Sequence, residues 1–221
     1  MLGMTYFLEM KFLINKKVFI PRPETEELVH WIIKNHFNNK NKMQVFDLCT
    51  GSGCIGISLK KKLSNIIENV YAIDFSNESI KIARKNAVLN NVKINFMITD
   101  IIKNIDSIPN SIINNNFTNL IVSNPPYIKT SNKKNLHYNI ICYEPHDSIF
   151  VSDKNPIIFY KNISSWIIKK FNGIVYLYFE IDSIYNNIIT KNLKSLGFFN
   201  IKTKKDFQGI YRMIYAEYHS G

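Results

Sequence analysis

The residues best suited to chemistry are Asn124, Pro125, Pro126 and Tyr127, which directly follow an apolar run that ends at Ser123. Prolines lack a backbone N–H and stiffen the chain, so the carbonyl groups of this turn are held outward as fixed acceptors. The side-chain oxygen of Asn124 and the backbone oxygen of Pro125 can accept both N–H bonds of a substrate –NH₂ group. Tyr127 would cover the flat group from one face. The pattern predicts a site for a planar amide or amine nitrogen.

Such a site suits methyl transfer from a sulfonium to nitrogen. An amide nitrogen is a poor nucleophile because its lone pair is delocalised, and acceptors on its N–H bonds orient that lone pair. The transfer is an in-line displacement that depends mainly on holding the nitrogen close to the methyl group, so no strong base is required at the outset. We therefore expect Asn124, Pro125 and Tyr127 to be the catalytic residues. The simpler alternative is a rigid proline turn after a strand.

A glycine-containing loop at residues 47–53 lies between an apolar run and a helical pattern. Glycines in this place turn tightly and let a ligand lie against backbone N–H groups at the helix start. Residues 51–56 also satisfy the dinucleotide fingerprint G-x-G-x-x-G, so the loop alone fits a nicotinamide cofactor equally well. The loop residues expected to contact a cofactor are Cys49, Thr50, Gly51, Ser52 and Gly53.

Carboxylates at the ends of successive predicted strands favour S-adenosylmethionine as that cofactor. Asp47 precedes the glycines, Asp74 ends the second strand and Asp100 ends the third. Asp74 can accept hydrogen bonds from both ribose hydroxyls of an adenosine, which both cofactor classes contain. Asp100, or the backbone at Ile101, can meet the adenine amino group. Any one of these carboxylates could instead be a solvated strand end or a helix cap.

From residue 43 to residue 221, short β-branched runs alternate with amphipathic helical stretches. This pattern predicts a Rossmann-like α/β catalytic domain with a doubly wound sheet. Six residues separate the last two predicted strands, too few for a crossover helix, so these strands should form an antiparallel hairpin in a seven-stranded, mostly parallel sheet. The predicted strands are residues 44–48, 70–73, 94–98, 120–123, 174–179, 199–204 and 211–218, and the predicted helices are residues 53–63, 77–90, 156–170 and 184–196.

Residues 1–42 are predicted to be a lead-in to this domain. Strands at residues 6–12 and 17–20 would form a small hairpin that closes near Asn15 and Lys16. A helix should follow, from a first turn that begins near Pro21 to about His36, because a proline and then three glutamates suit a helix N-terminus and its dipole.

The formal net charge is +11, from 28 Lys and Arg against 17 Asp and Glu. This excess fits a nucleic acid or an RNA-bound partner, but a bias toward the Lys, Asn and Ile residues that A/T-rich codons encode explains it as well. The three cysteines form no C-x-x-C pair and the five histidines show no metal-ligand spacing, so reduced thiols and no metal are expected. Charged residues interrupt the N-terminal apolar stretch before a signal peptide or membrane span could form, which favours a cytoplasmic protein with no membrane contact.

Five segments together resemble the peptide chain release factor glutamine methyltransferases, and the resemblance covers essentially the whole chain. The segment at residues 20–26 is more specific than Asn-Pro-Pro-Tyr, which also occurs in adenine and guanine methyltransferases. The resemblance implies a class I methyltransferase fold and transfer of a methyl group from S-adenosylmethionine to a glutamine side-chain amide. That glutamine lies in the Gly-Gly-Gln loop of class I release factors, which act in translation termination. The segments are IPRPETE at 20–26, DLCTGSGCI at 47–55, SNPPYI at 123–128, YEP at 143–145 and KDFQGIYR at 205–212.

The resemblance also implies roles for individual residues. Residues 49–53, Asp74, Ile101 and Asn124 would contact the cofactor, residues 124–127, which include Pro126, would grip the glutamine, and Arg22 and Glu24 would line the pocket entrance. Cys49 stands where the family has a glycine, and Ile101 where it often has an aromatic residue.

The chain begins near the hairpin that follows the family's N-terminal helical domain, so that domain is expected to be lacking. We expect a monomer whose partner is a class I release factor. Nucleic acid is not required for this activity, although incidental RNA contact would fit the charge.

Four alternatives remain open at this stage. A nucleic-acid methyltransferase would use the same tetrapeptide to grip an exocyclic amine of a flipped base, but it leaves residues 20–26 without a role. A glutamine methyltransferase of a large-subunit ribosomal protein fits the same motifs. A nicotinamide-dependent oxidoreductase fits residues 51–56 and leaves residues 124–127 unexplained. A non-catalytic remnant is the fourth.

Overall fold

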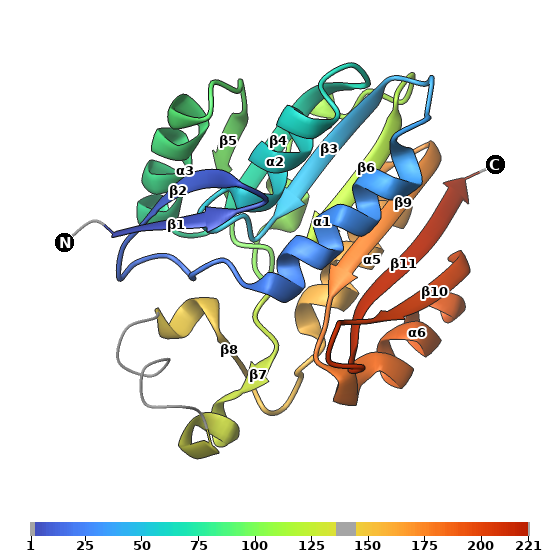
Figure 1. Cartoon of the computed structure of the whole chain (residues 1–221). Coiled ribbons are helices and arrows are strands. Elements are labelled where there is room, and N and C mark those ends of the chain that lie inside the picture. The colour runs from blue at the N-terminus through green and yellow to red at the C-terminus, as the bar shows by residue number, and fades with distance from the viewer. Residues whose placement is uncertain (1–2, 136–144, 221) are drawn as a thin grey trace.

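The computed structural model describes residues 3–135 and 145–220, which form a three-layer α/β structure (Figure 1). Its main sheet has the strand order β10-β11-β9-β6-β3-β4-β5. The central strands run parallel, whereas β11 pairs antiparallel with both β9 and β10. The strands of this sheet are β3 (Met43–Leu48), β4 (Ile67–Asp74), β5 (Asn95–Ile98), β6 (Thr118–Ser123), β9 (Gly173–Glu180), β10 (Phe199–Lys205) and β11 (Tyr211–Ser220). The predicted seven-stranded, mostly parallel sheet with a C-terminal antiparallel hairpin is confirmed.

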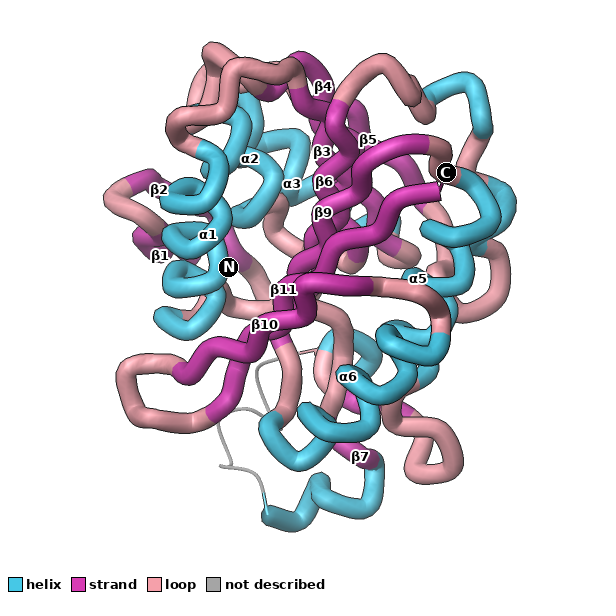
Figure 2. Tube along the Cα trace, turned by 90° about the vertical axis from the view of Figure 1, so that its right-hand side faces the viewer, coloured by secondary structure: helices cyan, strands magenta, loops and turns pink. Residues whose placement is uncertain are grey.

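Helices cover both faces of this sheet. Figure 2 shows α1 (Pro23–His36), α2 (Cys54–Lys62) and α3 (Asn77–Leu89) on one side, with α5 (Ile158–Lys170) and α6 (Asn186–Ser195) on the other. All six residues of β3 are buried, as expected for a central parallel strand with helices on both faces. These helices agree with the predicted ones to within two residues at each end.

Alternate side chains of β3 enter two separate hydrophobic cores. Val45 belongs to the core that includes Leu28 of α1, whereas Phe46 packs edge-on against Trp166 of α5, with ring centroids 5.6 Å apart. The first core also contains Phe7 of the N-terminal hairpin, so the lead-in segment and the sheet share buried apolar surface. The division of the chain at residues 42 and 43 stays a prediction.

The N-terminal hairpin exists, but its predicted strands were wrong. β1 (Gly3–Phe7) pairs with β2 (Met10–Ile14), and the chain turns at Leu8 and Glu9 rather than near Asn15 and Lys16. Both turn residues have positive φ, 49° and 65°, which matches the twist of a two-residue hairpin loop. Leu and Glu do not favour this conformation, so the sequence carries no local sign of it. A contact from α1 stabilises the turn, since Glu26 Oε1 accepts a hydrogen bond from Leu8 N at 3.1 Å.

A second, two-stranded sheet joins β7 (Ile128–Lys129) to β8 (Phe150–Val151). It follows the end of β6 and lies below the carboxyl ends of the central strands (Figure 1). Short 3₁₀ turns complete the described chain at Ile105–Ser107, Asn110–Ile112, Thr130–Asn135, His146–Ser148 and Ser183–Tyr185. Within the described ranges, no helix combines the length and the apolar character needed to cross a membrane.

The strand order changes direction at β3, because β4 lies on one side of it and β6 on the other. In open α/β sheets, ligands bind at the carboxyl ends of the strands on either side of such a switch point. The loops after β3, β4 and β6 all emerge at that edge. This topology therefore brings together the loops that contain the predicted site residues.

Candidate active site

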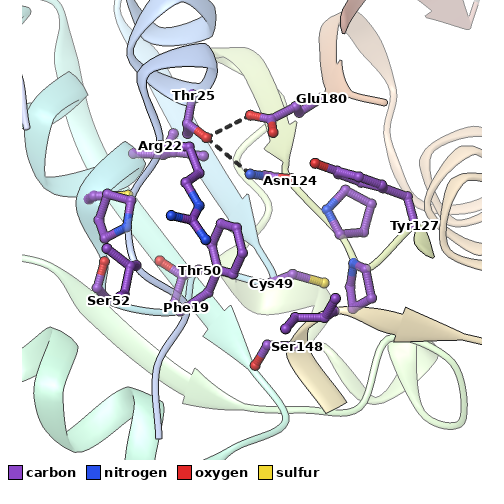
Figure 3. Close-up of a pocket in the computed structure, with 18 of the residues that line it drawn as sticks. Phe19, Arg22, Thr25, Cys49, Thr50, Ser52, Asn124, Tyr127, Ser148 and Glu180 are labelled. Carbon is purple, nitrogen blue, oxygen red and sulfur yellow. Dashed lines mark hydrogen bonds between the residues drawn. The ribbon is translucent and has the colours of Figure 1, made fainter. Parts of the chain in front are cut away.

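A cavity of about 750 Å³ opens at this edge of the sheet, within the size range of small-molecule sites. Figure 3 shows Cys49, Thr50 and Ser52 of the glycine loop on one side of it, and Asn124 and Tyr127 on another. Most of the predicted site residues line the cavity, but Gly53, Asp100 and Ile101 do not. The predicted residues that line it are Arg22, Glu24, Cys49, Thr50, Gly51, Ser52, Asp74, Asn124, Pro125, Pro126 and Tyr127.

The glycine loop is a tight turn with left-handed backbone at Cys49, Gly51 and Gly53, where φ is 62°, 55° and 83°. A Cβ atom added at Gly51 would meet nothing within 4 Å, so this glycine leaves room for a ligand to approach the backbone. A Cβ at Gly53 would instead lie 2.9 Å from Ile57 Cδ1 and 3.1 Å from Ala83 Cβ. Gly53 therefore permits α2 and α3 to pack closely, and it acts on the cavity only through the shape of the loop.

Asp47 holds the glycine loop from beneath, and it does not line the cavity. The carboxylate is fully buried, and its Oδ2 accepts hydrogen bonds from Thr50 Oγ1 at 2.5 Å and Gly56 N at 2.9 Å. Burial raises the pKa of Asp47 to about 7, against the pull of these two donors. Asp47 thus connects the start of the loop to the first turn of α2.

Asp74 and Asp100, which were predicted to have related roles, have different surroundings. Asp74 lines the cavity at the end of β4, and its Oδ2 accepts a hydrogen bond from Gly51 N at 2.9 Å. Burial raises the pKa of Asp74 above its usual value. Asp100 instead accepts hydrogen bonds from Ile102 N at 2.8 Å and Lys103 N at 3.2 Å, which makes it the cap of a turn. Ile101 is buried in the second core. A role for Asp100 or Ile101 with adenine stays a prediction.

Asn124 is connected to two residues that sequence reasoning did not identify. Its Nδ2 donates to Thr25 Oγ1 at 3.1 Å, and Thr25 Oγ1 donates to Glu180 Oε2 at 2.7 Å (Figure 3). Glu180 ends β9 and is 1% exposed, and its burial raises its pKa to about 7. Thr25 lies within the motif at residues 20–26, and Glu180 is a carboxylate that directly follows an apolar strand. The position of Glu180 directly after an apolar strand is the sequence signal that could have identified this residue.

The glutamates at the start of α1 contact three different parts of the chain. Glu24 lines the cavity, Glu26 accepts the hydrogen bond from the turn between β1 and β2, and Glu27 Oε1 accepts one from Phe207 N at 3.0 Å. Phe207 lies in the turn between β10 and β11. This helix start therefore joins both hairpins to the cavity, which explains why so polar a segment has a fixed position.

Two arginines also line the cavity. Arg22, the N-cap of α1, lies over the Phe19 ring at 5.2 Å and reaches toward the cavity in Figure 3. Arg212 of β11 was not singled out from the sequence. It is held by Asp206, with Nε 3.4 Å from Oδ2, and by the backbone oxygen of Ile181 at 3.4 Å. Arg212 and Glu180 thus place both signs of charge beside Tyr127.

Tyr127 packs beside this charged pair. Burial raises the pKa of Tyr127, so its phenol stays neutral at physiological pH. The preceding Pro125 and Pro126 are buried and fix the turn. The predicted motif at residues 143–145 lies mostly outside the described residues, which resume at Pro145. Among the residues that are described, no three His, Cys, Asp or Glu side chains are grouped as metal ligands.

This fold and cavity, together with the sequence relatives, define a class I S-adenosylmethionine-dependent methyltransferase. Residues 30–146 match the family described as Methyltransferase small domain. The release factor glutamine methyltransferase of Flavobacterium psychrophilum is 41% identical over 215 residues, which are 96% of this chain and 72% of that protein. The enzyme of the same name from Leptospira interrogans is 38% identical over 214 residues, 94% of this chain and 70% of that protein.

A solved structure extends this comparison. The protein-(glutamine-N5) methyltransferase (release factor-specific) from Alicyclobacillus acidocaldarius matches with a TM-score of 0.53 and 19% identity, over 91% of this chain and 95% of that chain. At this identity the match supports the fold alone. The sequence relatives go further: the chain belongs to the release factor glutamine methyltransferase family.

Proposed function

We propose that the protein transfers a methyl group from S-adenosylmethionine to the side-chain amide nitrogen of the glutamine in the Gly-Gly-Gln loop of a class I release factor. The observation that carries this proposal is that the glycine loop and residues 124–127 line one cavity. The family relatives named for this activity support the choice of glutamine over a nucleobase. The partner is the release factor, and the protein acts as a monomer in the cytoplasm.

The donor, when bound, supplies a methyl group on a positively charged sulfur. The residues that fit it are those of the glycine loop and Asp74. Gly51 leaves open space beside the loop backbone, and Asp74 lies in the cavity with a carboxylate that can accept hydrogen bonds from ribose hydroxyls. The aromatic ring of Phe75 lines the same part of the cavity, where it can pack against a planar base.

The acceptor turn positions the substrate amide. Asn124 Oδ1 and the carbonyl oxygen of Pro125 accept the two N–H bonds, so the nitrogen lone pair is directed toward the methyl group. Tyr127 packs against the amide plane. Because its phenol is neutral, we assign it a role in packing and not in removing a proton. Transfer would break the bond between the methyl group and the sulfur, leave the sulfur neutral and move the positive charge to the nitrogen. The nitrogen, now strongly acidic, would then lose one proton to water.

The test uses labelled S-adenosylmethionine with four acceptors, supplied separately: a release factor, its Gln-to-Ala loop variant, ribosomal proteins and adenine-containing DNA. Label in the intact release factor alone is the expected result. Label in the ribosomal protein or the DNA, with none in the release factor, would overturn the proposal.

Asn124→Ala provides the site-specific arm of this test. It should lower transfer at least about 100-fold, since it removes an acceptor for the reacting group, while cofactor affinity changes little. The matched control is Asn116→Ala, an exposed residue beyond the opposite end of β6. It should turn over like the wild type.

A further inference from the structure

Asn124, Thr25 and Glu180 form a hydrogen-bonded chain in the wall of the cavity, which all three residues line. Thr25 is 2% exposed and Glu180 is 1% exposed, so water does not compete freely for these contacts. We infer that Thr25 and Glu180 are positioning residues that set which end of the Asn124 side-chain amide faces the substrate. This inference rests on the proposed function, because it concerns the acceptor that Asn124 offers to the substrate nitrogen.

The direction of the chain follows from counting donors. An ionised carboxylate only accepts, so the single hydrogen of the Thr25 hydroxyl goes to Glu180 Oε2, 2.7 Å away. The Thr25 oxygen can then only accept from Asn124, which requires the NH₂ end of that amide at 3.1 Å. The carbonyl end, Oδ1, is left to accept a hydrogen bond from the substrate.

Shape alone would not achieve this orientation. The oxygen and nitrogen of a carboxamide are nearly equal in size, so the surrounding hydrogen bonds decide which way it points. A reversed Asn124 would direct its N–H groups at the N–H groups of the substrate amide, and the grip would be lost. The Asn124 amide also lowers the pKa of Glu180, as expected when N–H donors face a carboxylate.

The charge of Glu180 is therefore the switch that fixes the direction. Burial raises its pKa to about 7, Arg212 of β11 pulls the pKa down, and Glu24 of α1 pushes it up. The other titratable groups that interact with it are Tyr127, Tyr160 of α5 and Cys54 of α2, and Asp182 after β9 acts on the same two tyrosines. When Glu180 is protonated, the hydrogen of the Thr25 hydroxyl becomes available to Asn124. The Asn124 side-chain amide can then flip, so that its oxygen and nitrogen exchange places. Turnover should consequently fall as the pH decreases through about 7.

The experiment compares Thr25→Val, which keeps the shape and removes the hydroxyl, with Thr25→Ser, which keeps the hydroxyl. With saturating S-adenosylmethionine and the acceptor that wild type methylates, Thr25→Val should lower kcat about 10- to 100-fold. Its cofactor Kd should stay within about twofold, because the hydroxyl contacts Asn124 and Glu180 rather than the glycine loop. Thr25→Ser should restore most of the lost turnover. The control is Thr203→Val on β10, an exposed threonine, which should change neither quantity.

Glu180→Gln supplies a readout that a purely structural role would not change. Asp47 also has a pKa near 7, so the pH profile of kcat is measured at saturating cofactor, where effects on cofactor binding do not contribute. Glu180→Gln should lower kcat at pH 8 and should also lack the decrease below about pH 7 that wild type shows. This variant decides the question even if Thr25→Val does not fold.

Three results would overturn the inference. The first is a folded Thr25→Val that turns over like wild type, and the second is a folded Thr25→Val that loses cofactor binding and transfer together. The third is a Glu180→Gln that keeps the wild-type decrease in kcat below about pH 7. The proposed function is tested by a separate measurement, namely which acceptor the wild-type protein methylates. A failure of the proposed function can therefore be distinguished from each of these results.

Discussion

Asn86 Nδ2 lies 2.8 Å from the carbonyl oxygen of Ser52, and this hydrogen bond joins the glycine loop to helix α3. The same amide exchanges two hydrogen bonds with the backbone of Leu13, with Nδ2 donating at 3.0 Å and Oδ1 accepting at 2.6 Å. Asn86 is fully buried. One side chain thus connects the cofactor loop to the N-terminal hairpin, two segments that α1 and β3 separate along the chain.

Asn86→Ala should therefore affect both stability and the glycine loop. The substitution leaves the Ser52 carbonyl and both Leu13 backbone groups without their partner, which should lower the free energy of unfolding by about 3 kcal/mol. Cofactor affinity should also fall, because the loop loses one of its fixed points. Urea denaturation and calorimetric titration with S-adenosylmethionine measure the two effects.

Asn90→Ala is the matched control for this prediction. Asn90 lies one turn further along and its Nδ2 donates to the carbonyl oxygens of Lys11 and Asn86, both at 2.9 Å and near the surface. Its loss should lower the unfolding free energy by less than about 1 kcal/mol and leave cofactor affinity unchanged. Equal effects of the two variants would contradict a special role for Asn86.

Asp74→Ala should weaken cofactor binding far more than Asp100→Ala. Asp74 lines the cavity and holds Gly51 N, so its loss would remove the proposed ribose contact and loosen the loop, which together should raise Kd at least about 30-fold. Asp100 lies outside the cavity lining and caps the turn after it, so its loss should change Kd less than about threefold. If calorimetric titration gave similar losses, the adenine site would extend to Asp100.

Cys49→Gly should stabilise the protein slightly without loss of cofactor affinity. Cys49 has a φ of 62°, which a side chain with a Cβ adopts at a cost and a glycine adopts freely. The expected gain in the free energy of unfolding is about 0.5 to 1 kcal/mol, offset in part by lost packing of the thiol. Thermal denaturation measures this gain.

Cys49→Val is the opposite test at the same position. A β-branched side chain is more restricted still at positive φ, and its extra bulk would face the cavity that Cys49 lines. This variant should lose stability and bind the cofactor more weakly. If valine were as well tolerated as glycine, neither strain nor space would limit this position.

Much of this fold follows from local patterns. The strand at β3 and the loop after it were predictable because a run of apolar residues ends at Asp47 and glycines follow. Residues 124–127 line the cavity as expected, because topology brings the ends of β3 and β6 to one edge.

The features that escaped prediction depend on contacts between distant residues. The turn at Leu8 and Glu9 is stabilised by Glu26 rather than by its own residues. Thr25 and Glu180 meet only when α1 packs over the end of β9, and no spacing in the sequence encodes that. Contacts within one sequence motif can be predicted from the sequence, whereas contacts between distant motifs become known only from the folded structure.

The buried carboxylate of Glu180 leads to a prediction about stability. Its pKa rises on folding from an ordinary value of 4.5 to about 7, so the fold favours the protonated form. The contribution of protonated Glu180 to the free energy of unfolding is fully present below about pH 4.5, and it is lost as the pH rises through about 7. At about 1.4 kcal/mol for each pKa unit, the charged form lowers the free energy of unfolding by about 3 kcal/mol at pH 8.

Glu180→Gln removes this charge and should therefore be more stable than wild type at pH 8, by about 2 to 3 kcal/mol. The difference should disappear near pH 4, where Glu180 is protonated in both states. Urea denaturation of the two proteins at each pH isolates the effect, because Asp47 and His36 titrate in both. Equal stability at pH 8 would mean that hydrogen bonds fully offset the burial of the charge. A Glu180→Gln variant that gains stability while it loses turnover would instead show that the Glu180 carboxylate serves the reaction and lowers the stability of the folded protein.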